Sequence, residues 1–133
     1  MFASRLDRAT VECIHFAERS QLPNITDITK LGLFVGEIAG ENIRTKADLM
    51  AAIAEAMNFP EYFGKNWDAL DECLRDLNWI SAKGYVLIIH HANQLWEHAA
   101  LLAGQLVESW LFCDESWLQQ KVPFHLIFEM AKS

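Results

Sequence analysis

Four acidic residues and one arginine share one side of a segment that the sequence predicts to be helical, residues 66–77. At about 100° per residue, polar residues occupy one arc of this helix and apolar residues the opposite arc. The polar arc holds Asp68, Asp71, Glu72, Arg75 and Asp76. The apolar arc holds Trp67, Leu70, Cys73, Leu74 and Leu77. Carboxylates presented together on one helix face can bind a cationic surface, although a merely solvated polar face has the same pattern.

The residues before this helix strengthen the interpretation as a binding surface. Tyr62 and Phe63 are adjacent aromatic residues, so both cannot face one core. Gly64 permits a positive φ or a close backbone approach, and Asn66 is a favourable N-cap. Aromatic residues anchor protein–protein contacts and charges orient them. This combination is typical of a protein-recognition site.

Histidines near residue 90 suggest a competing function, a metal site. His90 and His91 are adjacent, so on a strand they point to opposite faces. Glu97 and His98 are also adjacent and cannot share a helix face, and the HExxH pattern of zinc proteases does not occur. The spacing therefore favours a strand end at His90 and a surface position for His98.

Two further alternatives are weaker. A nucleophilic pair of Cys73 with His15, His91 or His125 is disfavoured because Cys73 lies on the apolar arc of its helix. Base stacking would need basic residues between the tryptophans, and these are lacking. The tryptophans are therefore expected to fill the core; they are Trp67, Trp79, Trp96, Trp110 and Trp117.

The elements that position the acidic helix follow from hydrophobic periodicity. Strands are predicted at residues 31–38, 85–90 and 123–129. Helices are predicted at residues 45–57 and 66–77, and across residues 93–120 with a break near Gly104. The order β-α-α-β-α-β predicts an α/β fold with a small, mainly parallel sheet of three or four strands flanked by helices.

The first 30 residues are ambiguous. Leu6, Thr10, Cys13 and Ala17 fall at helical spacing, whereas residues 10–16 have the β-branched and aromatic content of a strand. We expect residues 1–30 to be an N-terminal extension packed on a domain that spans residues 31–133.

Composition limits the classes of function. The chain has 133 residues, 52% of them hydrophobic, and a formal net charge of −7. This acidity argues against general nucleic-acid binding, which needs a basic face, and favours a basic partner. Three cysteines without a CxxC pattern fit neither a disulfide framework nor a zinc site. Without a signal-peptide pattern or an apolar run long enough to cross a bilayer, the expected location is the cytoplasm, with no membrane association.

Residues 60–74, PEYFGKNWDALDECL, resemble the signature of the barstar family, intracellular inhibitors of barnase-type ribonucleases. The resemblance extends to residues 77–89 and to the last strand near residues 124–128. It implies that the loop and the acidic helix plug the active site of a ribonuclease. The implied partner-binding residues are Tyr62, Gly64, Asn66, Asp68, Asp71 and Glu72.

The sequence departs from the best-known family member in three ways. Asp71 stands where that member has a tryptophan, Glu72 replaces an aspartate, and about 30 residues precede the first family strand. These differences bear on which ribonuclease is bound. The expected function is stoichiometric inhibition of a basic ribonuclease, without catalysis and without a cofactor. The alternative is a barstar-like interaction domain whose basic partner is not a nuclease.

Overall fold

A four-stranded parallel sheet forms the centre of the protein. The computed structural model describes residues 5–61 and 63–131. The strands are β1 (Ile14–Glu18), β2 (Leu33–Ala39), β3 (Gly84–His90) and β4 (Phe124–Met130). Their order is β1-β4-β3-β2, and every neighbouring pair is parallel. This confirms the predicted α/β fold with a small parallel sheet.

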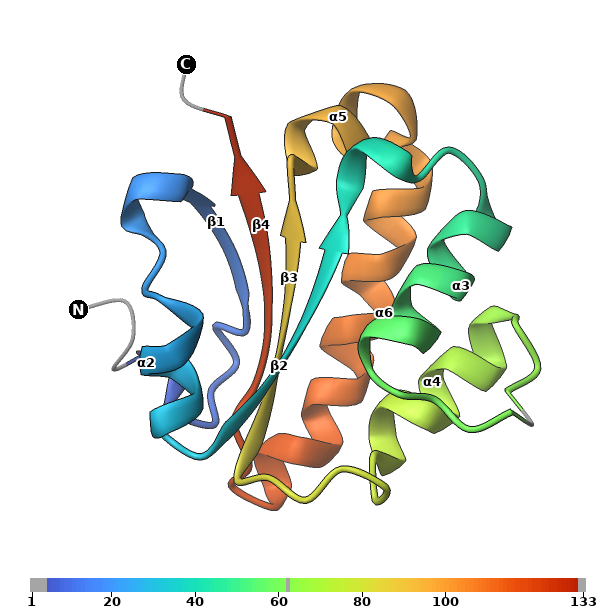
Figure 1. The fold of residues 1–133 in the computed structure, drawn as a ribbon. Helices are drawn as coiled ribbons and strands as arrows, with labels where there is room; N and C mark the ends of the chain where they lie inside the picture. The colour runs from blue at the N-terminus through green and yellow to red at the C-terminus, as the bar shows by residue number, and fades with distance from the viewer. Residues whose placement is uncertain (1–4, 62, 132–133) are drawn as a thin grey trace.

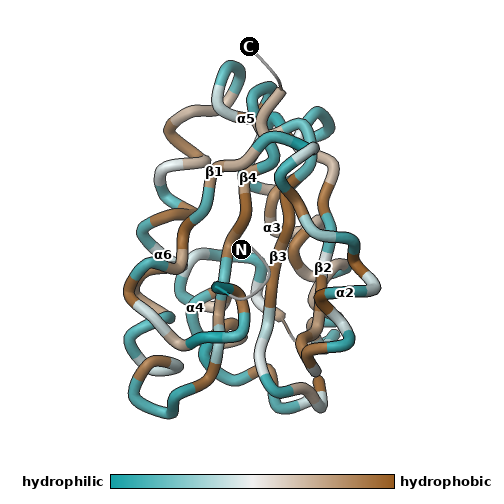
Figure 2. The backbone as a smooth tube through the Cα atoms, turned by 90° about the vertical axis from the view of Figure 1, so that its left-hand side faces the viewer, coloured by the Kyte–Doolittle hydropathy of each residue, from teal (hydrophilic) through white to brown (hydrophobic). Residues whose placement is uncertain are grey.

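The two central strands are buried because both faces of the sheet are covered. Val86 to Ile89 in β3 and Leu126 to Phe128 in β4 are at most 1% exposed. In the register between them, Leu87 lies beside Leu126 and Ile88 beside Ile127. A continuous apolar run of this length is what a strand covered on both faces requires. Figure 2 shows these two strands as largely hydrophobic segments in the middle of the fold.

Most of the helices cover one face of the sheet (Figure 1). These are α3 (Lys46–Ala56), α4 (Trp67–Asp76), α5 (Ala92–His98) and α6 (Ala100–Gln119). The other face carries α2 (Ile25–Lys30), which packs Ile28 against Val86, Ile88 and Ile127. Two short 3-10 helices, η1 (Arg19–Gln21) and η2 (Gly40–Asn42), follow β1 and β2.

The N-terminal segment is part of the folded unit. β1 pairs with β4, with Phe16 in register with Phe128, and Cys13 and Ala17 are buried. Of the two alternatives for this segment, the strand is therefore present, over residues 14–18, and in the described part of the segment before it helical geometry is limited to Arg5 and Leu6.

Two hydrogen-bonded histidines, His15 and His125, connect the segment around Arg8 to the sheet. His125 Nε2 donates a 2.8 Å hydrogen bond to the carbonyl oxygen of Arg8, because that oxygen can only accept. The His125 Nδ1 atom then accepts from His15 Nε2 at 2.9 Å. Burial, with a smaller contribution from His125, lowers the pKa of His15 to about 4.

The predicted helix break near Gly104 is wrong. The chain leaves helical geometry at Ala99, with φ −148° and ψ 50°, and α6 then runs without interruption past Gly104. Space around Gly104 would accept a Cβ without contact, so glycine is not required there. The strand predicted to start at residue 31 is β2, which begins two residues later, at Leu33. Gly32 turns the chain just before it, with φ +87°.

Candidate functional site

The acidic helix α4 begins where the sequence predicts. Asn66 has extended backbone angles, and its side-chain oxygen accepts a 2.8 Å hydrogen bond from the Ala69 amide. This N-cap satisfies one of the amides that the first turn leaves unpaired. The Asn66 side-chain amide also reaches the carbonyl oxygen of Gly64 at 3.4 Å, which ties the loop to the helix start.

The apolar side of α4 is anchored in the core as predicted. Leu70 and Leu74 are fully buried, and Cys73 is 6% exposed. Leu77 ends the helix in the left-handed region with φ 48°, and its side chain is also fully buried. Burial raises the pKa of the Cys73 thiol, helped by Asp76 and Glu72. The Cys73 side chain is therefore a neutral core group.

The opposite side of α4 presents carboxylates to solvent. Asp68, Glu72 and Asp76 are exposed. Within the part of the chain that the structure describes, no α4 carboxylate has an ion-pair partner within 4.0 Å. The side chain of Arg75 makes other contacts. Its guanidinium carbon lies 5.1 Å from the centre of the Phe112 ring, and its Nε donates to the Asp71 carbonyl oxygen. The negative charge of this face is therefore left available to a partner.

Asp71 differs from the other carboxylates of α4. It is half-buried and faces α6, where its Oδ1 lies 3.9 Å from the Cys113 Sγ. Burial and the Asp71 charge raise the pKa of Cys113 to about 12. The Cys113 thiol is thus a neutral, weak donor to the Asp71 side chain and main-chain oxygen.

The loop before α4 is built on an aromatic cluster. Phe63 is buried, with its ring 5.0 Å from that of Phe59, which in turn lies 5.8 Å from the Trp79 ring. Phe63 is thus a core residue, while Gly64 and Asn66 are exposed. A Cβ added at Gly64 would lie 3.3 Å from the Ala69 Cβ, a tight approach of loop to helix. Tyr62 lies outside the described residues.

The family model for barstar, described as the barnase inhibitor, matches residues 33–129, more than half of the chain. The chain belongs to the barstar family. A search among curated proteins returned no match. The barstar match runs from the first residue of β2 into β4, so it contains α4 and the loop before it. The strand β1 and helix α2 precede the barstar match.

The structure also places the residues of the alternative sites that the sequence suggested. Among the described residues, no group of three or more His, Cys, Asp or Glu side chains is arranged to hold a metal ion. His90 ends β3 and His98 is exposed at the end of α5, as predicted. Cys13, Cys73 and Cys113 are buried and free. In residues 5–61 and 63–131, no helix combines the length and hydropathy of a membrane span.

One cluster was missed by sequence reasoning. His90 contacts Glu37 of β2 and Glu129 of β4, residues 53 and 39 positions away along the chain. The signal that could have found it is topological, since the carboxyl ends of parallel strands meet at one edge of a sheet.

Proposed function

We propose that this protein inhibits a small basic ribonuclease by placing α4 and the preceding loop into the enzyme's active site. The observation that carries the proposal is the exposed carboxylate face of α4, which has no ion-pair partner among the described residues, in a member of a family described as barnase inhibitors. A ribonuclease binds a polyanion, so its active site is cationic and complementary to this face.

Asp68 and Glu72 are proposed to supply the main ionic contacts. They are four residues apart, so they are neighbours on one helix face. Their carboxylates would take the places of substrate phosphates and pair with basic side chains of the enzyme. The net charge of −7 would accelerate association by long-range attraction.

The remaining residues have supporting roles in the proposal. Gly64 and Asn66 shape the loop, and Tyr62 is the proposed aromatic anchor. Asp71, which is half-buried against α6, contributes charge at the margin of the surface. The three free cysteines support action in a reducing compartment such as the cytoplasm, as an antitoxin or immunity protein.

A titration of RNA cleavage tests this function. The purified chain is added to small basic ribonucleases of the barnase type, including any encoded beside its own gene. We expect activity to fall to a break near one-to-one and the double variant Asp68→Ala/Glu72→Ala to lose the effect. Unchanged cleavage by every enzyme would overturn the proposal and favour a basic partner that is not a nuclease.

A further inference from the structure

The surface of α4 continues onto the neighbouring helix α6. The two helices meet at Asp71 and Cys113, where the Asp71 Oδ1 lies 3.9 Å from the Cys113 Sγ. Phe112 comes one residue before Cys113 and is 49% exposed, so its ring lies at the solvent edge of this contact. Aromatic side chains are enriched among the anchors of protein–protein interfaces, and Phe112 is in the position of such an anchor.

Arg75 connects the Phe112 ring to the carboxylates of α4. Its guanidinium carbon lies 5.1 Å from the centre of the ring. Arg75 follows Glu72 by three residues and Asp71 by four, so it neighbours both on the helix surface. The Phe112 ring is therefore adjacent to the face of α4 that is proposed to contact the ribonuclease.

Carboxylates of α6 flank the ring on its outer side. Glu108 comes four residues before Phe112 and Glu115 three residues after it, and both are exposed. Among the described residues, neither lies within 4.0 Å of a basic group. Together with Asp68 and Glu72 these residues form the α4–α6 surface. An aromatic ring between exposed carboxylates suits a cation that stacks on the ring.

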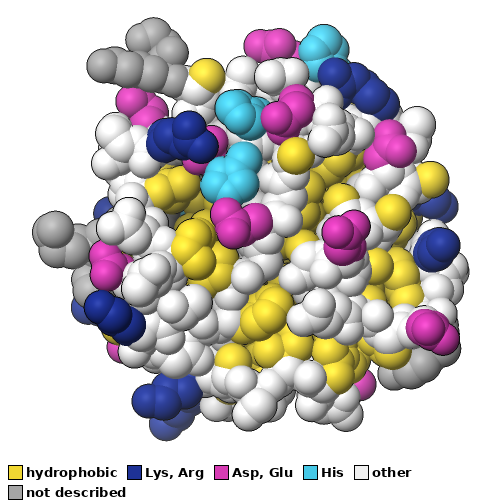
Figure 3. Space-filling model, viewed as in Figure 1, with side chains coloured by type: hydrophobic (Ala, Val, Ile, Leu, Met, Phe, Trp, Pro, Cys, Tyr) yellow, Lys and Arg dark blue, Asp and Glu magenta, His cyan; other side chains and the backbone are white. Residues whose placement is uncertain are grey.

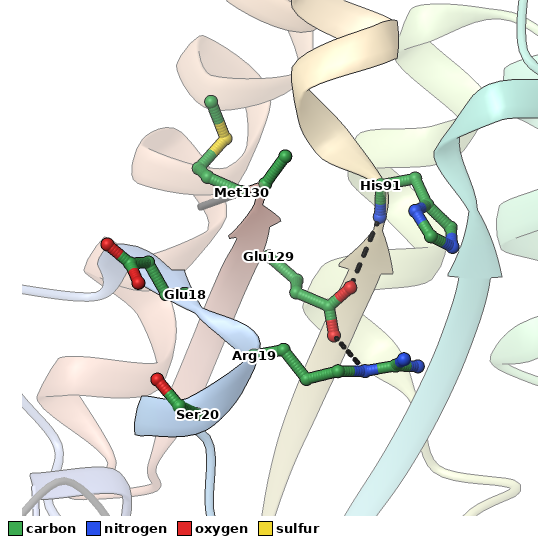
Figure 4. A pocket seen from close by; sticks show the side chains of 7 residues that line it. Glu18, Arg19, Ser20, His91, Glu129 and Met130 are labelled. Carbon is green, nitrogen blue, oxygen red and sulfur yellow. Dashed lines mark hydrogen bonds and ion pairs between the residues drawn. The ribbon is translucent and has the colours of Figure 1, made fainter. Parts of the chain in front are cut away.

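The charged side chains at the carboxyl ends of the strands are arranged differently. Figure 3 shows histidine and acidic side chains gathered at the end of the molecule where the strands of Figure 1 terminate. The Glu129 carboxylate lies 3.0 Å from the His90 Nδ1, and in Figure 4 it also lies between Arg19 and the main-chain N–H of His91. The charge at this end is compensated within the chain, unlike that of the α4–α6 surface.

The contact between Arg75 and the ring is easily replaced. Arg75 is exposed, and its Nε donates a 3.3 Å hydrogen bond to the Asp71 carbonyl oxygen. A cation–π contact is weak at an exposed site and becomes stronger when water is excluded. A basic side chain of a partner that covers the ring can therefore take the place of Arg75. The positive charge of the partner also repels Arg75 from the interface.

We propose that Phe112 is a further contact residue for the ribonuclease, and that a basic side chain of the enzyme stacks on its ring in place of Arg75. This inference rests on the proposed function, because the partner is the ribonuclease that α4 binds. Asp68 and Glu72 pair with cations in the active site, and Phe112 receives a cation at the margin. Arg75 competes with that cation in the free chain.

Calorimetry of binding between the full chain and a barnase-type ribonuclease that it inhibits tests the role of Phe112. Phe112→Leu keeps an apolar side chain without an aromatic face and should weaken binding about three- to tenfold, whereas Phe112→Trp should retain it. Leu101→Ala shortens a 79% exposed side chain of the same helix and should leave the affinity unchanged. If Glu72→Ala weakens binding and Phe112→Leu does not, the inference is overturned and the proposed function stands.

A double-mutant cycle tests the competition by Arg75. Arg75→Ala should bind about two- to fivefold more tightly, and this gain should vanish in the Phe112→Leu background, where no aromatic ring is left to compete for. A gain that persists in that background would reduce the effect of Arg75 to net charge. Weaker binding in Arg75→Ala would show that Arg75 itself contacts the enzyme. Either result would overturn the exchange.

A probe other than a ribonuclease separates the two proposals. The full chain is titrated with a hexaarginine peptide at fixed ionic strength, and the NMR signals of the Phe112 ring are followed. We expect saturable shifts of these signals, and weaker peptide binding in Phe112→Leu than in the natural chain. Inhibition of no ribonuclease would refute the proposed function, and Phe112 ring signals that stay unchanged with the peptide would refute the stacking site.

Discussion

The indole Nε1 of Trp117 donates a 2.7 Å hydrogen bond to the carbonyl oxygen of Leu74. Leu74 is in the last turn of α4, where carbonyl groups have no partner within the helix. Both side chains are buried, so water does not readily replace the donor. This bond joins the C-terminal end of the acidic helix to α6 and fixes the direction in which its carboxylates project.

Trp117→Phe should loosen the end of α4. The substitution leaves a buried carbonyl oxygen without its donor, a cost of about 1–3 kcal/mol. We expect faster hydrogen exchange at the amides of the last α4 turn. Trp110→Phe is the matched control, because the Trp110 Nε1 is buried without a hydrogen-bond partner in the described part of the chain. Equal loss of protection in both variants would contradict the role given to this hydrogen bond.

The N-cap at Asn66 should contribute to stability as well as to loop shape. Asn66→Ala removes the acceptor for the Ala69 amide and should lower the free energy of unfolding by about 1 kcal/mol, measured in urea. Asn66→Ser keeps a capping oxygen and should retain most of the stability. If the alanine and serine variants unfold at the same urea concentration, the cap is not stabilising.

Asp114 should make stability depend on pH. Burial raises its pKa from 3.8 to about 6, partly opposed by a hydrogen bond with Cys13. The folded state therefore holds the Asp114 proton more tightly than the unfolded state. The free energy of unfolding therefore falls by about 2–3 kcal/mol as pH rises from 3.8 through 6, because Asp114 then ionises in a buried site.

Asp114→Asn removes that ionisation. Relative to the natural chain, the variant should be close to neutral at pH 4 and more stable at pH 8, measured by urea unfolding at both values. Glu115→Gln, an exposed carboxylate on the same helix, should change stability little at either pH. An Asp114→Asn effect that is the same at pH 4 and pH 8 would show that burial does not raise the pKa of the Asp114 carboxyl group.

Local patterns in the sequence predict much of this fold. The apolar run of β3 predicts a buried strand, the residue pattern of α4 predicts a helix with one apolar face, and Asn66 caps that helix as expected. The break at Ala99 carries no such signal, because alanine favours helix, yet Ala99 leaves helical angles between α5 and α6. Tertiary context overrides local preference at that point.

The candidate site is predicted unevenly for the same reason. Asp68 and Glu72 are exposed where the wheel places them, but the wheel cannot show that Asp71 meets Cys113, because that contact depends on where α6 lies. Likewise, the sequence does not show which of the adjacent aromatic residues Tyr62 and Phe63 faces the core. The ring contact between Phe63 and Phe59 assigns Phe63 to the core. Contacts between segments that are distant in sequence can be predicted only when the topology of the fold is known.

The most direct test of the inhibitory surface is calorimetry of binding to a barnase-type ribonuclease that the chain inhibits, comparing Glu72→Ala with Glu97→Ala. Both substitutions remove one exposed carboxylate, the first from α4 and the second from α5. We predict a loss of more than about 2 kcal/mol in binding free energy for Glu72→Ala and a small change for Glu97→Ala. A loss below about 1 kcal/mol for Glu72→Ala, or equal losses for both, would contradict the assignment of the binding surface to α4.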